Sequence, residues 1–350
     1  MITKFSYNFS NQSCKILKYL FLISLAWNIF QAKAVANFKQ ANTSAVKINQ
    51  ASTDTIYLAD PTIFLDKGIY YLYGTSSDQG FLVYQSPDLK TWSGPVGKTN
   101  GFALAKGDAY GSKGFWAPQV FKSGHIYYMA YTADEHIAIA QSDSPLGPFK
   151  QKEIKALSGD GKQIDPFVFR DKDGKIYLYH VRLTEGNRIF VARMKDDFSD
   201  ILPETVTPCI SGTQEWENTA KTRWPVTEGP TVLKKRDLYY LFYSANDFRN
   251  PDYAVGYATA ASPFGPWKKS DQSPIISRNL LKVNGTGHGD FFTDKKGNLL
   301  YVFHTHHSNT KVSPRATALI KVKFVNTGLD NDQVVVDPSG FQYLKIKKAP

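Results

Sequence analysis

The chain has 350 residues, a formal net charge of +11 and only two cysteines. Its basic residues are scattered along the sequence apart from a small group, KIKK, near the end, whereas a nucleic-acid-binding face gathers them on one surface. The composition therefore argues against nucleic acid as a partner and excludes a disulfide-stapled fold. A chain of this length can bury a sizeable core without such staples.

The first 34 residues have the three-part layout of a secretory signal peptide. Three lysines precede the apolar run YLFLISLAWNIF, and the QAKA that follows offers small residues at the spacing read by a signal peptidase. The alternative, an N-terminal membrane anchor, needs a longer apolar run. Cleavage would remove Cys14 and four lysines, which lowers the net charge from +11 to +7 and leaves Cys209 as the one cysteine. We therefore expect a secreted or periplasmic protein that makes no membrane contact after cleavage.

Residues 35–53 lack apolar periodicity and are predicted to form a flexible leader. Residues 54–350 are predicted to form the folded domain, because one pattern occurs there five times. Each copy consists of a short apolar strand, a polar turn and a second strand rich in tyrosine. The copies are ADPTIFLDKGIYYLYGTS from Ala59, WAPQVFKSGHIYYMAYTA from Trp116, IDPFVFRDKDGKIYLYHV from Ile164, EGPTVLKKRDLYYLFYSA from Glu228 and HGDFFTDKKGNLLYVFHT from His288.

A third strand follows several of the copies, and turns such as SPLGPF and SPFGPW then precede a fourth, outer strand. A repeat of about 50–60 residues, with short strands and no convincing helix, is typical of a β-propeller. The sequence therefore predicts an all-β fold, a five-bladed β-propeller in which each blade is a four-stranded antiparallel sheet. The alternative, a meander within an unrelated sandwich, does not account for five matched copies.

The first strand of each blade in a propeller lies nearest the axis, so the residues at its start surround one mouth of the central channel. Aligning the copies on their apolar pairs places five residues in equivalent positions, namely Asp60, Ala117, Asp165, Gly229 and His288. Glu228 stands one residue before its equivalent position, and its longer side chain can still reach inward. The ring is therefore expected to carry acids from blades one, three and four, and a histidine from blade five.

Asp165 and Glu228 belong to neighbouring blades and are expected to lie close together, with Asp60 opposite them. Two nearby carboxylates cannot both ionise easily, so one of them keeps its proton to a higher pH. A protonated acid facing an ionised carboxylate is what inverting glycoside hydrolysis needs. One group activates water while the other protonates the leaving oxygen, with the two carboxyls roughly 6.5–9.5 Å apart.

The acidic motifs resemble those of glycoside hydrolase family 43, the family of arabinofuranosidase-like and β-xylosidase-like five-bladed propellers. Asp60-Pro61, Asp165-Pro166 and Glu228-Gly229-Pro230 stand in the family's order, and the resemblance covers roughly residues 54–325. It implies that Asp60 is the general base, that Asp165 modulates the pKa of the acid, and that Glu228 is the general acid. The ring arrangement alone leaves open whether Asp165 or Glu228 donates the proton.

The resemblance also implies roles in substrate binding for Trp116, Arg315 and His288. The ring of Trp116 can stack on a sugar at the channel mouth, and the alternative is that it fills the core between blades. Arg315 would reach the first sugar subsite, and the alternative is a surface cation at a strand start. No cofactor is required, but the family's fifth-blade histidine, here His288, often touches a calcium ion held mostly by waters in the central channel. No oxygen-rich chelating loop is visible in the sequence.

The segment FHTHHS places His304, His306 and His307 close together. Two histidines at alternating strand positions share a face and could bind zinc. No carboxylate or cysteine completes a ligand set, so we interpret them as strand histidines.

The resemblance implies an inverting glycosidase that releases terminal α-L-arabinofuranosyl or β-D-xylosyl residues from plant cell-wall polysaccharides or oligosaccharides. Endo-arabinanase and exo-β-1,3-galactosidase activities stay open within the same family. A non-catalytic carbohydrate-binding propeller is the alternative from another class, but a lectin has no need of three carboxylates on non-equivalent blades. The sequence predicts neither protein partners nor an oligomeric state.

Overall fold

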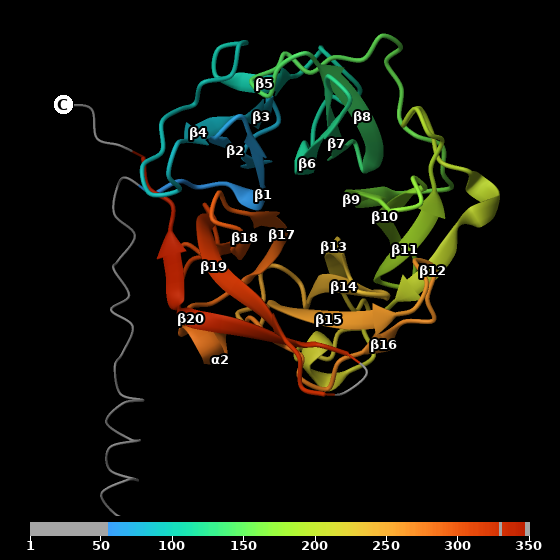
Figure 1. Ribbon diagram of the computed structural model, residues 1–350, viewed down its shortest axis with the longest axis vertical. Helices are drawn as coiled ribbons and strands as arrows, with labels where there is room; N and C mark the ends of the chain where they lie inside the picture. Colours follow the sequence, from blue (N-terminus) through green and yellow to red (C-terminus); the bar gives the residue numbers. More distant parts are fainter. Residues whose placement is uncertain (1–54, 329–330, 347–350) are drawn as a thin grey trace, which may run out of the picture. The chain divides into compact units, whose positions relative to one another are not determined.

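The computed structural model describes residues 55–328 and 331–346, so the signal peptide and the leader predicted for residues 1–53 lie outside the described residues. The described chain is built almost entirely from antiparallel strands arranged as a five-bladed β-propeller, which confirms the predicted fold (Figure 1). Its helical structure is limited to single turns, namely α2 (Arg278–Leu281) and the 3-10 turns Pro203–Thr205 and Glu215–Glu217. None of these described helices has the length and apolar character needed to cross a membrane.

Blades three, four and five each have four named strands, which run outward from the axis in chain order. Blade three comprises β9 (Gln163–Arg170), β10 (Ile176–Leu183), β11 (Asn187–Arg193) and β12 (Thr207–Ile210). Blade four comprises β13 (Thr227–Lys235), β14 (Leu238–Ala245), β15 (Ala254–Ala260) and β16 (Lys268–Lys269). Blade five comprises β17 (Gly287–Thr293), β18 (Leu299–Thr305), β19 (Ala316–Val325) and β20 (Gln333–Tyr343).

Blades one and two have a shorter outer edge. Blade one comprises β1 (Ala59–Asp66), β2 (Ile69–Thr75) and β4 (Tyr84–Ser86), and blade two comprises β6 (Trp116–Ser123), β7 (Ile126–Ala133) and β8 (His136–Ser142). The place of the fourth strand is taken by single bridges, from Ser93 to Gln85 in blade one and from Lys150 to Gln141 in blade two. β3 (Gly80–Leu82) and β5 (Phe102–Ala105) form a separate two-stranded sheet beside β2 of blade one.

The inner strands contact one another in the circular order β1, β6, β9, β13 and β17, and these five labels surround the centre of Figure 1. Five hydrophobic clusters form the core, one between each pair of adjacent blades. Because every blade packs on both faces, strands such as β14 and β15 are buried along nearly their whole length. Their apolar runs therefore lack the alternation that a strand with one solvated face would show.

The tyrosine-rich second strands and the repeated Ser-Pro turns are partners in the fold. Tyr73 in blade one donates a hydrogen bond to the carbonyl of Pro145 in blade two, and Tyr179 in blade three donates to the carbonyl of Pro263 in blade four. In both pairs the ring is buried between the blades and the hydroxyl reaches the turn of the next blade. A buried tyrosine needs such a partner for its hydroxyl, so the two repeated sequence features stabilise one interface.

The two ends of the described chain close the ring by backbone pairing. The N–H of Ile56 donates to the carbonyl of Leu344 at 2.9 Å, and the N–H of Trp92 donates to the carbonyl of Lys345 at 3.2 Å. Leu344 is 1% exposed and packs in the cluster between blades five and one with Ile56 and Trp92. The segment after β20 therefore belongs to both the last and the first blade.

We expect the Leu344→Ala substitution to lower the free energy of unfolding by about 2–5 kcal/mol, because it leaves a cavity at the ring closure. Equilibrium denaturation in guanidinium would measure this loss. Val335→Ala, in the preceding strand β20 and 39% exposed, is the control and should change the free energy by about 0.5 kcal/mol or less. Equal effects of the two substitutions would show that closure by Leu344 does not stabilise the propeller.

Candidate active site

The start of each inner strand has the same backbone conformation. Each of these strands contains a bulge, and the residue within it has a positive φ in the left-handed region. The residues are Asp60 (φ 48°), Ala117 (46°), Asp165 (56°), Gly229 (58°) and His288 (44°). These are the five positions that the repeat alignment makes equivalent. A bulge re-aims the side chains on either side of it, so these residues turn toward the channel mouth instead of into a blade interface.

Four of the five ring residues are held by a side chain from the preceding blade. In each case the backbone N–H is the donor. Ala117 donates to Thr75 Oγ1 at 2.9 Å and Asp165 to Thr132 Oγ1 at 2.9 Å. His288 donates to Ser244 Oγ at 2.7 Å and Asp60 to His304 Nδ1 at 3.1 Å.

The fifth contact, at Gly229, differs. The residue of blade three at the place of Thr75, Thr132, Ser244 and His304 is Val181, whose side chain has no hydrogen-bond acceptor. The N–H of Gly229 donates instead to Asp165 Oδ2 at 3.1 Å. Asp165 is thereby tied to blade four, next to Glu228. The left-handed Gly229 is also packed against the ring of His288, which a Cβ at this position would approach within 2.8 Å.

The structure brings the three acidic residues together in one cavity of about 430 Å³ at the channel mouth. Asp60, Asp165 and Glu228 are all buried, with at most 8% of each residue exposed. The floor is formed by these acids and by His288, and the rim by aromatic and charged residues from several blades. Cavities of this size hold small ligands or a few sugar units.

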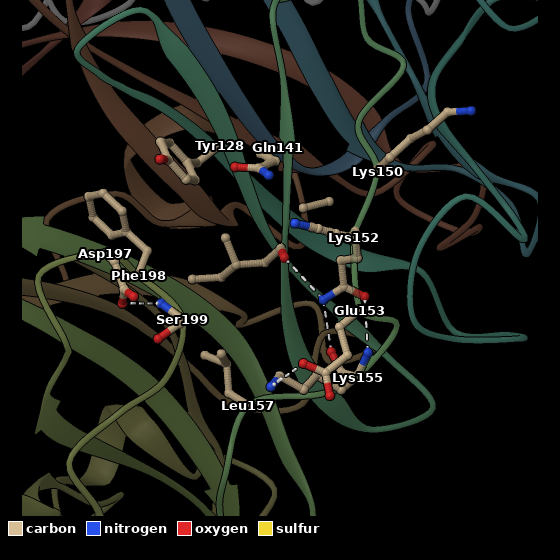
Figure 2. Close-up of a pocket in the computed structure, with 13 residues that line it drawn as sticks. Tyr128, Gln141, Lys150, Lys152, Glu153, Lys155, Leu157, Asp197, Phe198 and Ser199 are labelled. Atoms are coloured by element: carbon tan, nitrogen blue, oxygen red, sulfur yellow. Dashed lines mark hydrogen bonds and ion pairs between the residues drawn. The ribbon is translucent and has the colours of Figure 1, made fainter.

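A second, larger cavity of about 520 Å³ lies at the outer edge of blades two and three (Figure 2). It is lined by two carboxylates: Asp197 is exposed, and the side chain of Glu153 is 76% exposed and forms a solvated ion pair with Lys155 at 2.8 Å. No pair of buried acids lines this cavity in the described chain. The chemistry expected from the sequence therefore has its place at the channel mouth.

Asp60 is held in its ionised form. Burial raises its pKa, but the charge of Arg315 and the neighbouring imidazoles of His288 and His304 outweigh burial, so the pKa lies well below the ordinary value. Arg315 Nη1 is 3.0 Å from Asp60 Oδ1, and the hydroxyl of Thr75 donates to Oδ2 at 2.7 Å. A carboxylate with these donors stays charged throughout the physiological range.

Asp165 and Glu228 are shifted in the opposite direction. Burial, the charge of Glu228 and the charge of Asp60 raise the pKa of Asp165 well above its ordinary value. Burial also raises the pKa of Glu228 to about 7, against the hydrogen bonds from Tyr253 and Asn187. The two groups titrate as one pair, which keeps at least one proton near neutral pH. One cavity therefore holds both an ionised carboxylate and a carboxylic acid.

The predicted substrate-binding residues also line this cavity. Trp116 is 38% exposed, so it does not fill the core between blades. Arg315 has a side chain only 15% exposed and contacts Asp60, so it is not a surface cation. His288 lies 3.5 Å from Asp60 and 3.9 Å from Asp165, measured from Nδ1 to the carboxylate oxygens. Their roles toward a substrate stay predictions.

The three clustered histidines point to different partners. His304 contacts Asp60 and Arg315, His306 bonds the carbonyl of Phe248 at 2.8 Å, and the ring of His307 packs against Tyr57. In the part of the chain that the structure describes, no group of three His, Cys, Asp or Glu side chains could hold a metal ion. Zinc coordination by this segment does not fit these positions, and a calcium ion near His288 would depend on water ligands.

Sequence reasoning missed several side chains of the site. Thr75 and His304 position Asp60, while Tyr253 Oη donates to Glu228 Oε1 at 2.8 Å and Asn187 Nδ2 donates to Oε2 at 2.9 Å. Thr75 and His304 occupy equivalent places at the ends of second strands, so the repeat alignment could have identified them. Asn187 and Tyr253 begin or precede third strands, where the repeats are too dissimilar to align.

Comparison with known proteins agrees with this geometry. The model of the family "Glycosyl hydrolases family 43" matches residues 55–329. A crystal structure of an endo-1,4-beta-xylanase from Bacteroides thetaiotaomicron is 38% identical and has a TM-score of 0.76, covering 84% of this chain and 98% of that one. A beta-D-galactofuranosidase of Aspergillus niger is 25% identical over 78% of this chain and 81% of its own length.

A third relative, an extracellular endo-alpha-(1->5)-L-arabinanase of Bacillus subtilis, is 27% identical over 67% of this chain but only 54% of its own length. The family match extends over most of the described residues and includes all three acidic motifs. With the propeller and the buried carboxylates, it shows that the chain belongs to glycosyl hydrolase family 43 and is a glycosidase.

Proposed function

We propose that the chain is an inverting glycosidase that removes terminal α-L-arabinofuranosyl or β-D-xylosyl residues from plant polysaccharides or oligosaccharides. The observation that carries the proposal is the opposite ionisation of Asp60 and the Asp165–Glu228 pair within one small cavity. The names of relatives, which include a xylanase, an arabinanase and a xylosidase/arabinosidase, support a pentose-containing substrate. Several relatives are named extracellular, which supports export by the predicted signal peptide.

In the proposed reaction Asp60 removes a proton from a water molecule whose oxygen attacks the anomeric carbon. The bond between that carbon and the leaving oxygen breaks, and the leaving oxygen takes the proton of Glu228. Asp165 keeps Glu228 protonated by opposing a second negative charge in the cavity. Trp116 and Arg315 bind the sugar whose anomeric carbon is attacked.

Hydrolysis of a panel of nitrophenyl glycosides would test the proposal and identify the sugar. We expect release from the α-L-arabinofuranoside or the β-D-xyloside, and no hydrolysis of any member would contradict it. Linear arabinan and xylan would separate the modes of cleavage. Monosaccharide products support exo action, whereas the early appearance of longer oligosaccharides would support endo action, as in the name of the Bacteroides thetaiotaomicron relative.

Glu228→Gln should lower kcat on a natural oligosaccharide by about 10²–10⁴-fold, because general acid catalysis typically contributes that much. Steady-state kinetics on oligosaccharides would measure it, since a dinitrophenyl leaving group barely needs a proton. Near-wild-type turnover of the oligosaccharide would show that Glu228 is not the acid.

Thermal unfolding provides the matching control on the fold. Glu228 has a pKa of about 7 in the folded chain against an ordinary value of 4.5. The folded state therefore holds the proton more tightly, and wild-type stability falls as pH rises between these values. We therefore expect the Tm of Glu228→Gln minus the Tm of the wild type to be more positive at pH 8 than at pH 5.

Asp165→Asn should move the basic limb of the pH–activity profile to lower pH. In the wild type, loss of the last proton leaves Asp165 and Glu228 both negatively charged, which raises the pKa of that step. In the variant Glu228 ionises beside a neutral amide, so its proton leaves at lower pH. The pH dependence of kcat/KM would show the shift. An unmoved basic limb in a folded variant would mean that Asp165 does not control the acid.

Inversion should be visible in the first-formed product. Asp60 and Glu228 line one cavity but come from blades one and four, whose inner strands are not neighbours in the ring, so we expect room for a water molecule between them. Proton NMR would record the anomeric configuration before mutarotation. Retention would require carboxyls roughly 5–5.5 Å apart and a covalent intermediate, and would remove Asp60 from the role of base.

A further inference from the structure

Trp224 places an exposed aromatic surface at the rim of the cavity. Trp224 precedes β13, the strand that carries Glu228. It lines the same cavity as the acids and is 48% exposed. Large aromatic side chains are costly to leave in water, and their faces bind the apolar faces of sugars. Its edge is fixed, because the indole N–H donates to Asn187 Oδ1 at 2.9 Å.

Asn187 joins this aromatic surface to the acid. Its Oδ1 accepts from Trp224 while its Nδ2 donates to Glu228 Oε2 at 2.9 Å, so both ends of the amide are used. The backbone of Asn187 is held as well, since its N–H donates to the carbonyl of Pro225 and its carbonyl accepts from Thr227 Oγ1, both at 3.0 Å. Two contacts hold the side-chain amide and two hold the backbone, all from residues in or just before β13, so the amide has one orientation toward Glu228.

We propose that Trp224 is the binding platform for the sugar on the leaving-group side, and that Asn187 is a positioning residue that couples this platform to the carboxyl of Glu228. The inference rests on the proposed function, because it is the general acid that must face the leaving oxygen. A sugar ring stacked on Trp224 lies beside the group that protonates it. The two hydrogen bonds of Asn187 keep the platform and the acid in a fixed relation.

This coupling differs from the contacts at the opposite carboxylate. Asp60 is held by Arg315, Thr75 and His304, none of which bonds to Asn187 or Trp224. Trp116, the other exposed tryptophan of the cavity, comes from blade two and has no hydrogen bond to Glu228 among the described residues. The aromatic surface tied to the acid is therefore Trp224.

Three substrates of the sugar identified by the nitrophenyl panel separate the two roles. A trisaccharide needs both the platform and the acid, a methyl glycoside needs the acid alone, and a dinitrophenyl glycoside needs little protonation. Asn187→Ala should lower kcat about tenfold or more on the trisaccharide and the methyl glycoside, and change it no more than about twofold on the dinitrophenyl glycoside.

Two changes at Trp224 test the platform. Trp224→Phe keeps an aromatic face and loses the N–H, so the KM for the trisaccharide should stay within about twofold while kcat falls. Trp224→Ala should also raise that KM, by about tenfold. The KM for the methyl glycoside should not change. Because Trp224→Phe leaves Asn187 in place, it keeps the coupling testable if Asn187→Ala does not fold.

The pH profile distinguishes positioning from structural damage. A donor to the carboxylate lowers the pKa of Glu228, so its removal in Asn187→Ala should move the basic limb to higher pH, opposite to Asp165→Asn. Asn298→Ala is the matched control, because Asn298 bonds Asp294 in an exposed turn at the other end of blade five. Asn298→Ala should leave kcat and KM on all three substrates, and the pH profile, unchanged.

The results that overturn the coupling are specific. Equal slowing of all three substrates by Asn187→Ala, or an unmoved basic limb, would show that Asn187 does not position the acid. Wild-type kcat on the trisaccharide in Trp224→Phe would show that the indole N–H is not part of the coupling, and a wild-type KM in Trp224→Ala would remove the platform. A wild-type enzyme inactive on every substrate would instead overturn the proposed function.

Discussion

The site depends on a left-handed residue at one point of every inner strand. Outside glycine this conformation costs of the order of 1–3 kcal/mol, and at four ring positions the residue is not glycine. The hydrogen bond from the preceding blade helps to hold each strained residue, so the interfaces that build the ring also stabilise its backbone. The carboxylates are therefore fixed by the same contacts that hold the propeller together.

Equivalent positions nevertheless acquire different chemistry, because their neighbours differ. Asp60 and Asp165 share backbone conformation and burial, yet the pKa of Asp60 is low and that of Asp165 is high. Arg315 and two histidines surround the first, whereas the second faces Glu228. A propeller thus needs no change of backbone to make one carboxylate ionised and another protonated, since a few side chains at strand ends decide the ionisation.

The fold could be predicted from the sequence because each blade repeats the same strand and turn pattern, and the ring positions followed from aligning the copies. Asp60, Asp165 and Glu228 were therefore placed correctly at the channel mouth. The shortened outer edges of blades one and two could not be foreseen, because Ser93 and Lys150 reach the sheet through loops without a strand pattern. The role of Asn187 could not be predicted for a related reason, because its contact with Glu228 depends on how blades three and four pack against each other.

The rim of the cavity, in contrast, comes largely from loop segments that do not repeat, and the loop before Trp224 is anchored by a buried carboxylate. Glu217, in the loop before Trp224, is fully buried and accepts hydrogen bonds from Tyr243 and Lys269, both at 2.6 Å, and from the backbone of its own loop. Removing one partner of such a buried pair leaves an uncompensated charge, which typically costs about 3–5 kcal/mol. Trp224 thus follows a loop anchored by a buried carboxylate, whereas Asn187 is the first residue of β11 in blade three. Differences in substrate among propellers that share these acids would then arise from which side chains such anchored rims carry.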